Sequence, residues 1–129
     1  MNAKDLMLGD WVQQTDPIHN GEPMQVKELR IIHCQDGSDI YLVCDETADV
    51  SEELVAPIPL TTEIISGIYR CPNMTIQWDD RLTEESGEYW YELSINDGTG
   101  ISLTLQLRYV HELQHAMRLC GIDNVVINL

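Results

Sequence analysis

Residues 89–107 read YWYELSINDGTGISLTLQL and decide the fold of the second half of the chain. Two β-rich runs, 89–95 and 101–107, flank the turn sequence Asn96-Asp97-Gly98-Thr99-Gly100, an arrangement typical of a β-hairpin. Upstream, 74–78 alternates apolar and polar residues and predicts a third strand. Together the three runs predict an antiparallel meander. We expect residues 79–88, which are rich in Asp and Glu, to form an acidic loop between the first two strands.

The meander is followed by the clearest helix pattern in the sequence, at residues 109–120. At 100° per residue, one arc about 120° wide collects the apolar side chains Tyr109, Val110, Leu113, Ala116, Met117 and Cys120. Gly121 stands where a glycine commonly ends a helix. The polar residues fall on the opposite side, where we expect them to face solvent. Residues 125–129 predict a last short strand.

The first half of the chain is β-rich and contains many turn residues. Runs at 9–13, 24–32 and 40–44 predict short strands, which favour a small, strongly bent sheet of the SH3-like kind. The two prolines of Pro57-Ile58-Pro59-Leu60 enforce an extended joint, after which Thr61 or Thr62 caps a short helix that ends at Gly67. The sequence therefore predicts an α+β protein with a β-rich lobe at 1–56 and an α+β lobe at 57–129.

The chain has 129 residues, with 22 Asp and Glu against 7 Lys and Arg, and a formal net charge of −15. This acidity argues against direct binding of nucleic acid or of an anionic membrane, because both need a basic surface. Residues 31–69 hold eight acids and no Lys or Arg. They predict either a solubilising face or, as an alternative, a nucleic-acid mimic that occupies a basic groove on another protein.

The N-terminus has no apolar run of the kind found in signal peptides, so we expect a cytoplasmic protein. The four cysteines lack Cys-x-x-Cys spacing and are not expected to form a disulfide framework in a reducing compartment. The aromatic residues Trp11, Trp78, Tyr89, Trp90 and Tyr91 are expected to lie in the core rather than to form a stacking surface.

One motif carries possible chemistry, because residues 111–115 match His-Glu-x-x-His. On a helix this spacing places His111 and His115 on one face as zinc ligands, with Glu112 as the general base for a metal-bound water. This is the alternative interpretation: a zinc-dependent hydrolase with zinc as its cofactor.

The context of the motif favours an ordinary amphipathic helix with no cofactor. A catalytic zinc needs a third protein ligand, and only Cys120 and Asp123 are conceivable after His115. An upstream ligand would have to come from residues such as His19, His33 or Cys34. The fixed positive charge of Arg118 also projects near both imidazoles and opposes a dication there.

Three short segments spread over the chain resemble one family. They are Leu6-Met7-Leu8-Gly9-Asp10-Trp11-Val12, Pro57-Ile58-Pro59-Leu60-Thr61 and Tyr109-Val110-His111-Glu112-Leu113-Gln114. The family comprises small uncharacterised proteins of gut Bacteroidetes, often associated with prophage or other mobile elements. Its usual helix resembles Tyr-Val-His-Gln-Leu-Gln-Asn, so Glu112 and His115 depart from the pattern, which argues further against a zinc role.

Taken together, these features predict a non-catalytic binding or accessory module of a mobile element. The resemblance implies that His111, Leu113 and Gln114 belong to a structural helix cap or a lobe contact. We expect the partner to be another protein or a second copy of the chain, with no direct contact to nucleic acid or membrane.

Overall fold

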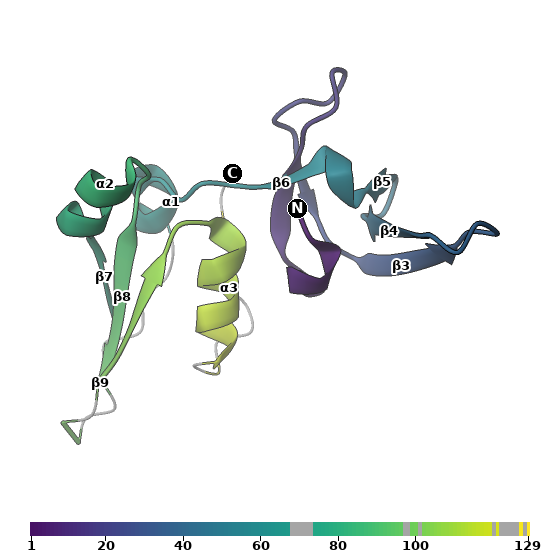
Figure 1. The fold of residues 1–129 in the computed structure, drawn as a ribbon. Helices are drawn as coiled ribbons and strands as arrows, with labels where there is room; N and C mark the ends of the chain where they lie inside the picture. Colours follow the sequence, from purple (N-terminus) through teal and green to yellow (C-terminus); the bar gives the residue numbers. More distant parts are fainter. Residues whose placement is uncertain (68–73, 97–98, 101, 120, 122–126, 128) are drawn as a thin grey trace. The chain divides into compact units, whose positions relative to one another are not determined.

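The structure is a computed structural model that describes residues 1–67, 74–96, 99–100, 102–119, 121, 127 and 129 (Figure 1). The chain divides into two compact units, Met1–Ile58 and Pro59–Leu129, called unit 1 and unit 2 below. The division falls two residues after the expected boundary. Within the described residues, no helix is long and apolar enough to cross a membrane.

The α+β class is confirmed. The described part of the chain contains nine strands, arranged in three antiparallel sheets of three strands each, and three α-helices. The finer expectation of an SH3-like barrel stays a prediction.

Unit 1 contains two of the sheets, with strand orders β2-β1-β6 and β3-β4-β5. Its elements are the 3-10 helix η1 (Ala3–Asp5), β1 (Trp11–Gln14), β2 (Pro23–Gln25), β3 (Glu28–His33), β4 (Asp39–Cys44), β5 (Asp49–Ser51), the 3-10 helix η2 (Glu52–Leu54) and β6 (Val55–Pro57). The core of unit 1 consists of small and medium apolar side chains, namely Ala3, Leu6, Val12, Met24, Val26, Val43, Val50 and Val55.

The single strand expected at 24–32 is in fact two strands, β2 and β3, in different sheets. The break lies at Val26 and Lys27. Val26 is fully buried, and its N–H donates to the carbonyl of Asp10 at 2.8 Å, whereas the Lys27 N–H donates to the carbonyl of Cys44 at 2.8 Å. The chain thus leaves one sheet and joins the other, which explains why the apolar alternation of this run is imperfect.

Unit 2 contains the meander, and its predicted strand order is confirmed. Met74–Trp78 (β7), Tyr91–Asn96 (β8) and Ser102–Leu107 (β9) form one antiparallel sheet in the order β7-β8-β9. The short helix α1 (Thr62–Ser66) also forms as expected. The Thr61 side chain accepts a hydrogen bond from the N–H of Ile64, and Gly67 ends the helix.

The acidic loop expected at 79–88 is wrong, because most of it forms the helix α2 (Asp80–Ser86). The Asp79 carboxylate accepts a hydrogen bond from the Leu82 N–H at 3.0 Å and caps the first turn. Gly87 ends the helix with φ +75°, a left-handed conformation that favours glycine. The two caps therefore stabilise α2 although the helix buries none of its residues.

The C-terminal helix is confirmed as α3 (Val110–Leu119), and Gly121 has the left-handed conformation expected after it, with φ +78°. The expected inner face is buried at Val110, Leu113, Ala116 and Met117. Cys120 and most of the strand expected at 125–129 lie outside the described residues.

Candidate functional site

The first imidazole of the His-Glu-x-x-His motif is buried, which corrects the expectation that it faces solvent. His111 is only 8% exposed, and Gln114 is buried as well. The imidazole of His111 stacks on the ring of Tyr109, with centroids 5.9 Å apart and planes at 10°. Because an imidazole has apolar ring faces, it can extend a buried helix surface beyond the arc of hydrocarbon residues.

The Glu112 side chain caps the start of α3. Its Oε1 accepts hydrogen bonds from the backbone N–H groups of Arg108 at 2.9 Å and Tyr109 at 3.0 Å. Glu112 is the third residue of α3, the position from which a glutamate reaches back to the residue before a helix. A glutamate at the third position of a helix is the sequence signal for this cap. In this chain the same glutamate also completes the His-Glu-x-x-His pattern, which suggests a different role.

The two histidines of the motif are neighbours, as their spacing predicts. The ring centroids of His111 and His115 are 5.6 Å apart, with the rings at 79°. Among the described residues, no three or more His, Cys, Asp or Glu side chains gather in a group suited to a metal ion.

The upstream ligand candidates are in unit 1. His19 contacts Glu22 at 3.1 Å and His33 contacts Asp39 at 2.7 Å, while Cys34 is half-buried. The downstream candidates, Cys120 and Asp123, lie outside the described residues.

Unit 2 carries an aromatic surface. Its exposed residues, Trp78 and Tyr89, were expected from the sequence to lie in the core. Tyr89 is 64% exposed and Trp78 is 42% exposed, whereas Tyr91 is buried as expected. The ring of Trp78 lies 5.2 Å from that of Tyr89 and 5.5 Å, edge-on, from that of Tyr91. We call Trp78 and Tyr89, with the two pockets beside them, the Tyr89 surface.

The sheet and α2 together position these rings. Trp78 is the last residue of β7 and pairs with Tyr91 across the β7–β8 ladder. The N–H of Asp79 donates to the carbonyl of Trp90 at 2.9 Å. The segment that contains α2 therefore leaves the sheet after β7 and returns to it beside the end of that strand. Tyr89 therefore reaches Trp78 from outside the strand.

Two shallow pockets adjoin Tyr89, which is among the lining residues of both. One has a volume of about 240 Å³ and the other about 200 Å³. The larger is lined by Leu60, Thr61, Thr62, Glu63, Trp78, Tyr89 and Tyr91. The smaller is lined by Pro59, Glu88, Tyr89, Arg108 and Tyr109.

The one guanidinium that lines the smaller pocket is neutralised locally. Arg108 lies over the ring of Trp90 at 4.5 Å and over that of Tyr109 at 5.0 Å. It also donates a hydrogen bond to Glu88 at 3.0 Å, which raises the pKa of Arg108. The cation is thus fixed as part of the pocket wall by stacking and by an ion pair.

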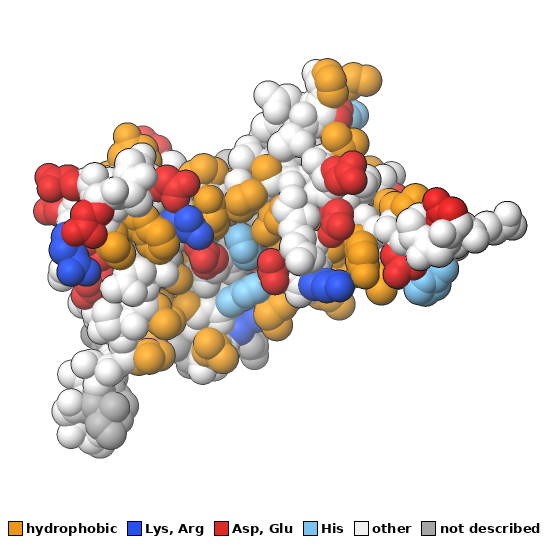
Figure 2. All heavy atoms as spheres, viewed as in Figure 1, with side chains coloured by type: hydrophobic (Ala, Val, Ile, Leu, Met, Phe, Trp, Pro, Cys, Tyr) orange, Lys and Arg blue, Asp and Glu red, His pale blue; other side chains and the backbone are white. Residues whose placement is uncertain are grey.

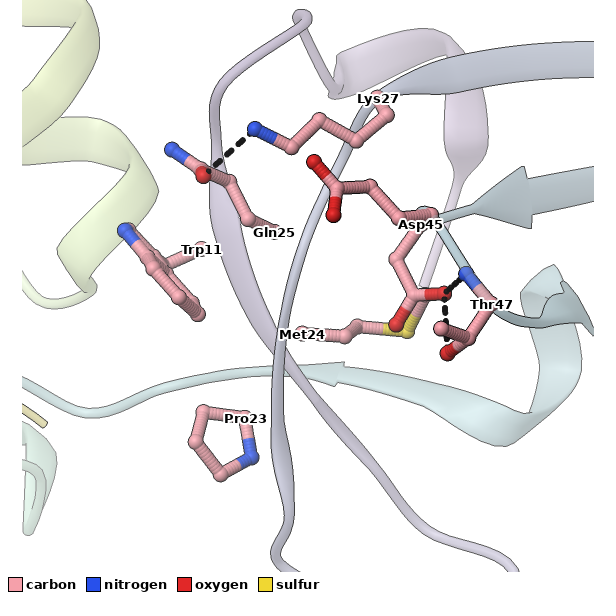
Figure 3. A pocket seen from close by; sticks show the side chains of 8 residues that line it. Trp11, Pro23, Met24, Gln25, Lys27, Asp45 and Thr47 are labelled. Atoms are coloured by element: carbon pink, nitrogen blue, oxygen red, sulfur yellow. Dashed lines mark hydrogen bonds between the residues drawn. The ribbon is translucent and has the colours of Figure 1, made fainter.

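A third pocket, of about 310 Å³, lies in unit 1 (Figure 3). Its lining combines apolar and charged residues, namely Trp11, Pro23, Met24, Gln25, Lys27, Asp45, Glu46 and Thr47. Lys27 donates to Gln25 at 3.0 Å, and the Asp45 carboxylate accepts bonds from the N–H and hydroxyl of Thr47. The main polar groups are therefore engaged with their own neighbours.

Many of the acids in 31–69 have structural contacts. Asp36 and Asp45 accept hydrogen bonds within their own turns, and these bonds lower the pKa of both carboxyls. Asp49 pairs with Arg30, and Glu52 accepts a bond from the N–H of Ala3. These acids hold turns and strands in place, in addition to supplying charge.

The chain matches no known protein-family model, no curated protein and no solved structure.

Proposed function

We propose that this protein is a cytoplasmic, non-catalytic binding module, an accessory of a mobile element, that docks an extended segment of a partner protein on the Tyr89 surface. The exposure of the Tyr89 and Trp78 rings, at 64% and 42%, carries the proposal. Large aromatic side chains dominate the energetics of protein interfaces when they become buried there. The mobile-element context is supported by the family resemblance alone.

The shape of the surface favours a proline-containing ligand. Two mainly apolar pockets share the exposed Tyr89 in their lining, and further aromatic side chains and Pro59 line them. A segment in the polyproline II conformation presents its prolines as preformed ridges that fit such aromatic-lined depressions at a low entropic cost.

The charge of the surface favours basic residues beside those prolines. Glu63 lines the larger pocket, and in the smaller pocket the charge of Arg108 is offset by Glu88. The chain as a whole has 22 acids against 7 bases. Complementary charge speeds association and selects among partners, so an Arg-rich or Lys-rich segment is preferred.

The capping role of Glu112 supports a non-catalytic function. A general base must reach the proton that it removes, whereas the Oε1 atom of Glu112 is bonded to two backbone N–H groups at the start of α3. The zinc hydrolase remains a second candidate because the His111 and His115 rings are adjacent.

The test uses four fluorescent synthetic peptides. Each has either two prolines three residues apart or alanines at those two positions, and each set is made with either flanking arginines or flanking glutamates. We expect fluorescence polarisation to detect the strongest binding with the proline–arginine peptide. Tyr89→Ala should weaken that binding about 30-fold, the effect of losing an interface residue worth about 2 kcal/mol.

The matched control is Leu103→Ala, which removes another exposed apolar side chain from β9 of the same unit and should leave binding unchanged. Equal affinity for all four peptides, or an unchanged affinity after Tyr89→Ala, would overturn the proposal.

A further inference from the structure

The edge strand β3 exposes an unusual amount of apolar surface. It is the outer strand of the β3-β4-β5 sheet, and every one of its six residues is exposed. Ile31 is 52% exposed and Ile32 is 46% exposed. Hydrophobic side chains are visible at the surface around β3 and β4 in Figure 2. A long, apolar, uncovered edge strand is a site at which another strand pairs readily.

Both faces of the β3–β4 hairpin carry these side chains. Leu29 and Ile31 are two residues apart and therefore share one face of the hairpin. Ile32 lies on the other face, directly opposite Ile40 of β4. Ile40 is also exposed. An ordinary antiparallel sheet with one solvated face would show polar residues on that face. On the face of Ile32 the neighbouring residues Glu28 and Arg30 are indeed polar, so Ile32 and Ile40 form an apolar pair at one end of that face.

The backbone of β3 presents hydrogen-bonding groups along its free edge. The Cys34 N–H donates to the carbonyl of Ser38 at 2.8 Å, which continues the β3–β4 register by one bonded pair beyond Ile32 and Ile40. Because bonded and non-bonded pairs alternate in antiparallel ladders, the even-numbered residues of β3 bond to β4. The N–H and C=O groups of the odd-numbered residues, Leu29, Ile31 and His33, therefore point away from the sheet.

We propose that β3 is a dimer interface, at which a second copy of this chain pairs antiparallel with β3 and Ile31 lies opposite its own counterpart. In this register Leu29 of each copy faces His33 of the other. All three outward-pointing residues of both copies then form bonded pairs, whereas a shift by two residues in either direction removes one such pair. The interface is isologous, as a two-fold axis requires.

The local charge favours a second copy as the occupant. Unit 1 has twelve acids and three bases in its sequence, and two of those bases, Lys27 and Arg30, lie on or beside β3. Arg30 forms ion pairs with Glu28 at 2.9 Å and with Asp49 at 3.1 Å. Two strongly acidic molecules that meet along β3 therefore approach at a strand where bases offset part of the acidic charge, which reduces their mutual repulsion.

The first experiment measures the molar mass of the full chain by light scattering over a concentration series at physiological salt. We expect a species with twice the 14.7 kDa of the chain, and we expect Ile31→Lys to be monomeric. The control Ile18→Lys adds the same charge at a residue that is 84% exposed in the turn between β1 and β2, and should stay dimeric. A monomeric wild-type chain, or a dimeric Ile31→Lys variant, would overturn the proposal.

The second experiment tests the register and does not need a charged substitution. In the proposed pairing the two Ile31 Cα atoms form a bonded pair about 5.5 Å apart, a distance that a disulfide can span. Under mild oxidation Ile31→Cys should cross-link between copies through residue 31, identified by peptide mapping. Ile32→Cys, displaced by two residues from its counterpart, should cross-link far less.

Equal cross-linking of the Ile31→Cys and Ile32→Cys variants would overturn the pairing. The Tyr89→Ala variant should remain dimeric. A failure of the dimer proposal can therefore be distinguished from a failure of the proposed peptide site.

Discussion

The carboxylate of Glu112 and the backbone N–H of Tyr109 are joined by a hydrogen bond of 3.0 Å, and the same Oε1 atom accepts a second bond from the N–H of Arg108. These bonds satisfy two backbone donors at the start of α3 that have no partner within the helix. The glutamate of the motif thus has a structural task that does not require a metal.

The cap can be tested by two substitutions at one position. We expect Glu112→Ala to lower the free energy of unfolding by about 1 kcal/mol, because both backbone bonds are lost. Glu112→Gln should retain most of that stability, since its side-chain carbonyl oxygen can accept the same bonds. Urea unfolding followed by circular dichroism measures both, and an equal loss in the two variants would contradict the cap.

Zinc titration by calorimetry examines the competing interpretation of α3. We expect no stoichiometric, tight zinc site, because the His111 ring is buried and stacked on Tyr109 and the Glu112 carboxylate caps the start of α3. Chelation should correspondingly leave the melting temperature unchanged. Zinc binding at one equivalent that disappears in both His111→Ala and His115→Ala would contradict this expectation and favour the zinc alternative instead.

The turn at Asp45 predicts a pH dependence of stability. Hydrogen bonds from the N–H groups of Thr47 and Ala48 lower the pKa of the Asp45 carboxyl in the folded state. A carboxyl with a lowered folded pKa contributes stability above its unfolded pKa, and this contribution is lost as the pH falls through the folded value. The loss therefore occurs below about pH 4.

In Asp45→Asn we expect a lower free energy of unfolding at neutral pH and a shallower decline between pH 4 and pH 2. Unfolding curves at closely spaced pH values provide the measurement. Parallel curves for the wild-type chain and the variant would show that Asp45 does not contribute to acid sensitivity.

The two described cysteines should differ in reactivity. Cys44 is buried, and this burial, reinforced by Asp49, raises the pKa of its thiol to about 11. Cys34 is half-buried. Because the thiolate is the reactive form, iodoacetamide at pH 8 should modify Cys34 at least roughly tenfold faster than Cys44. Peptide mapping during the reaction gives both rates, and denaturant should abolish the difference.

Local sequence signals were sufficient for much of the fold. The Thr61 cap and Gly67 delimit α1, and the apolar arc of 109–120 predicts α3, because caps and periodicity are properties of neighbouring residues. The caps of α2 were equally local, at Asp79 and Gly87. Hydrophobic periodicity does not indicate this helix, because a short, acidic helix without an apolar face has none.

Burial could not be predicted in the same way. Strand alternation assigns Trp78 to a face, but whether that face is covered depends on elements elsewhere in unit 2. Tyr89 lies two residues before β8 begins, so strand alternation does not apply to it at all. His111 shows the converse, because its ring packs on Tyr109 on the side of α3 that was expected to face solvent. The candidate site therefore depended on tertiary packing that no local pattern encodes.

The position of Glu112 within α3 also bears on how short motifs are weighed in any sequence. The third residue of a helix is selected for glutamate by capping alone, so a histidine just before it and another three residues after it complete the zinc-protease pattern without any selection for a metal. Estimates of chance matches that use composition only are therefore too low at helix starts. Pattern searches would gain specificity by scoring where in its helix a glutamate stands, since an interior glutamate has no free backbone amide to cap.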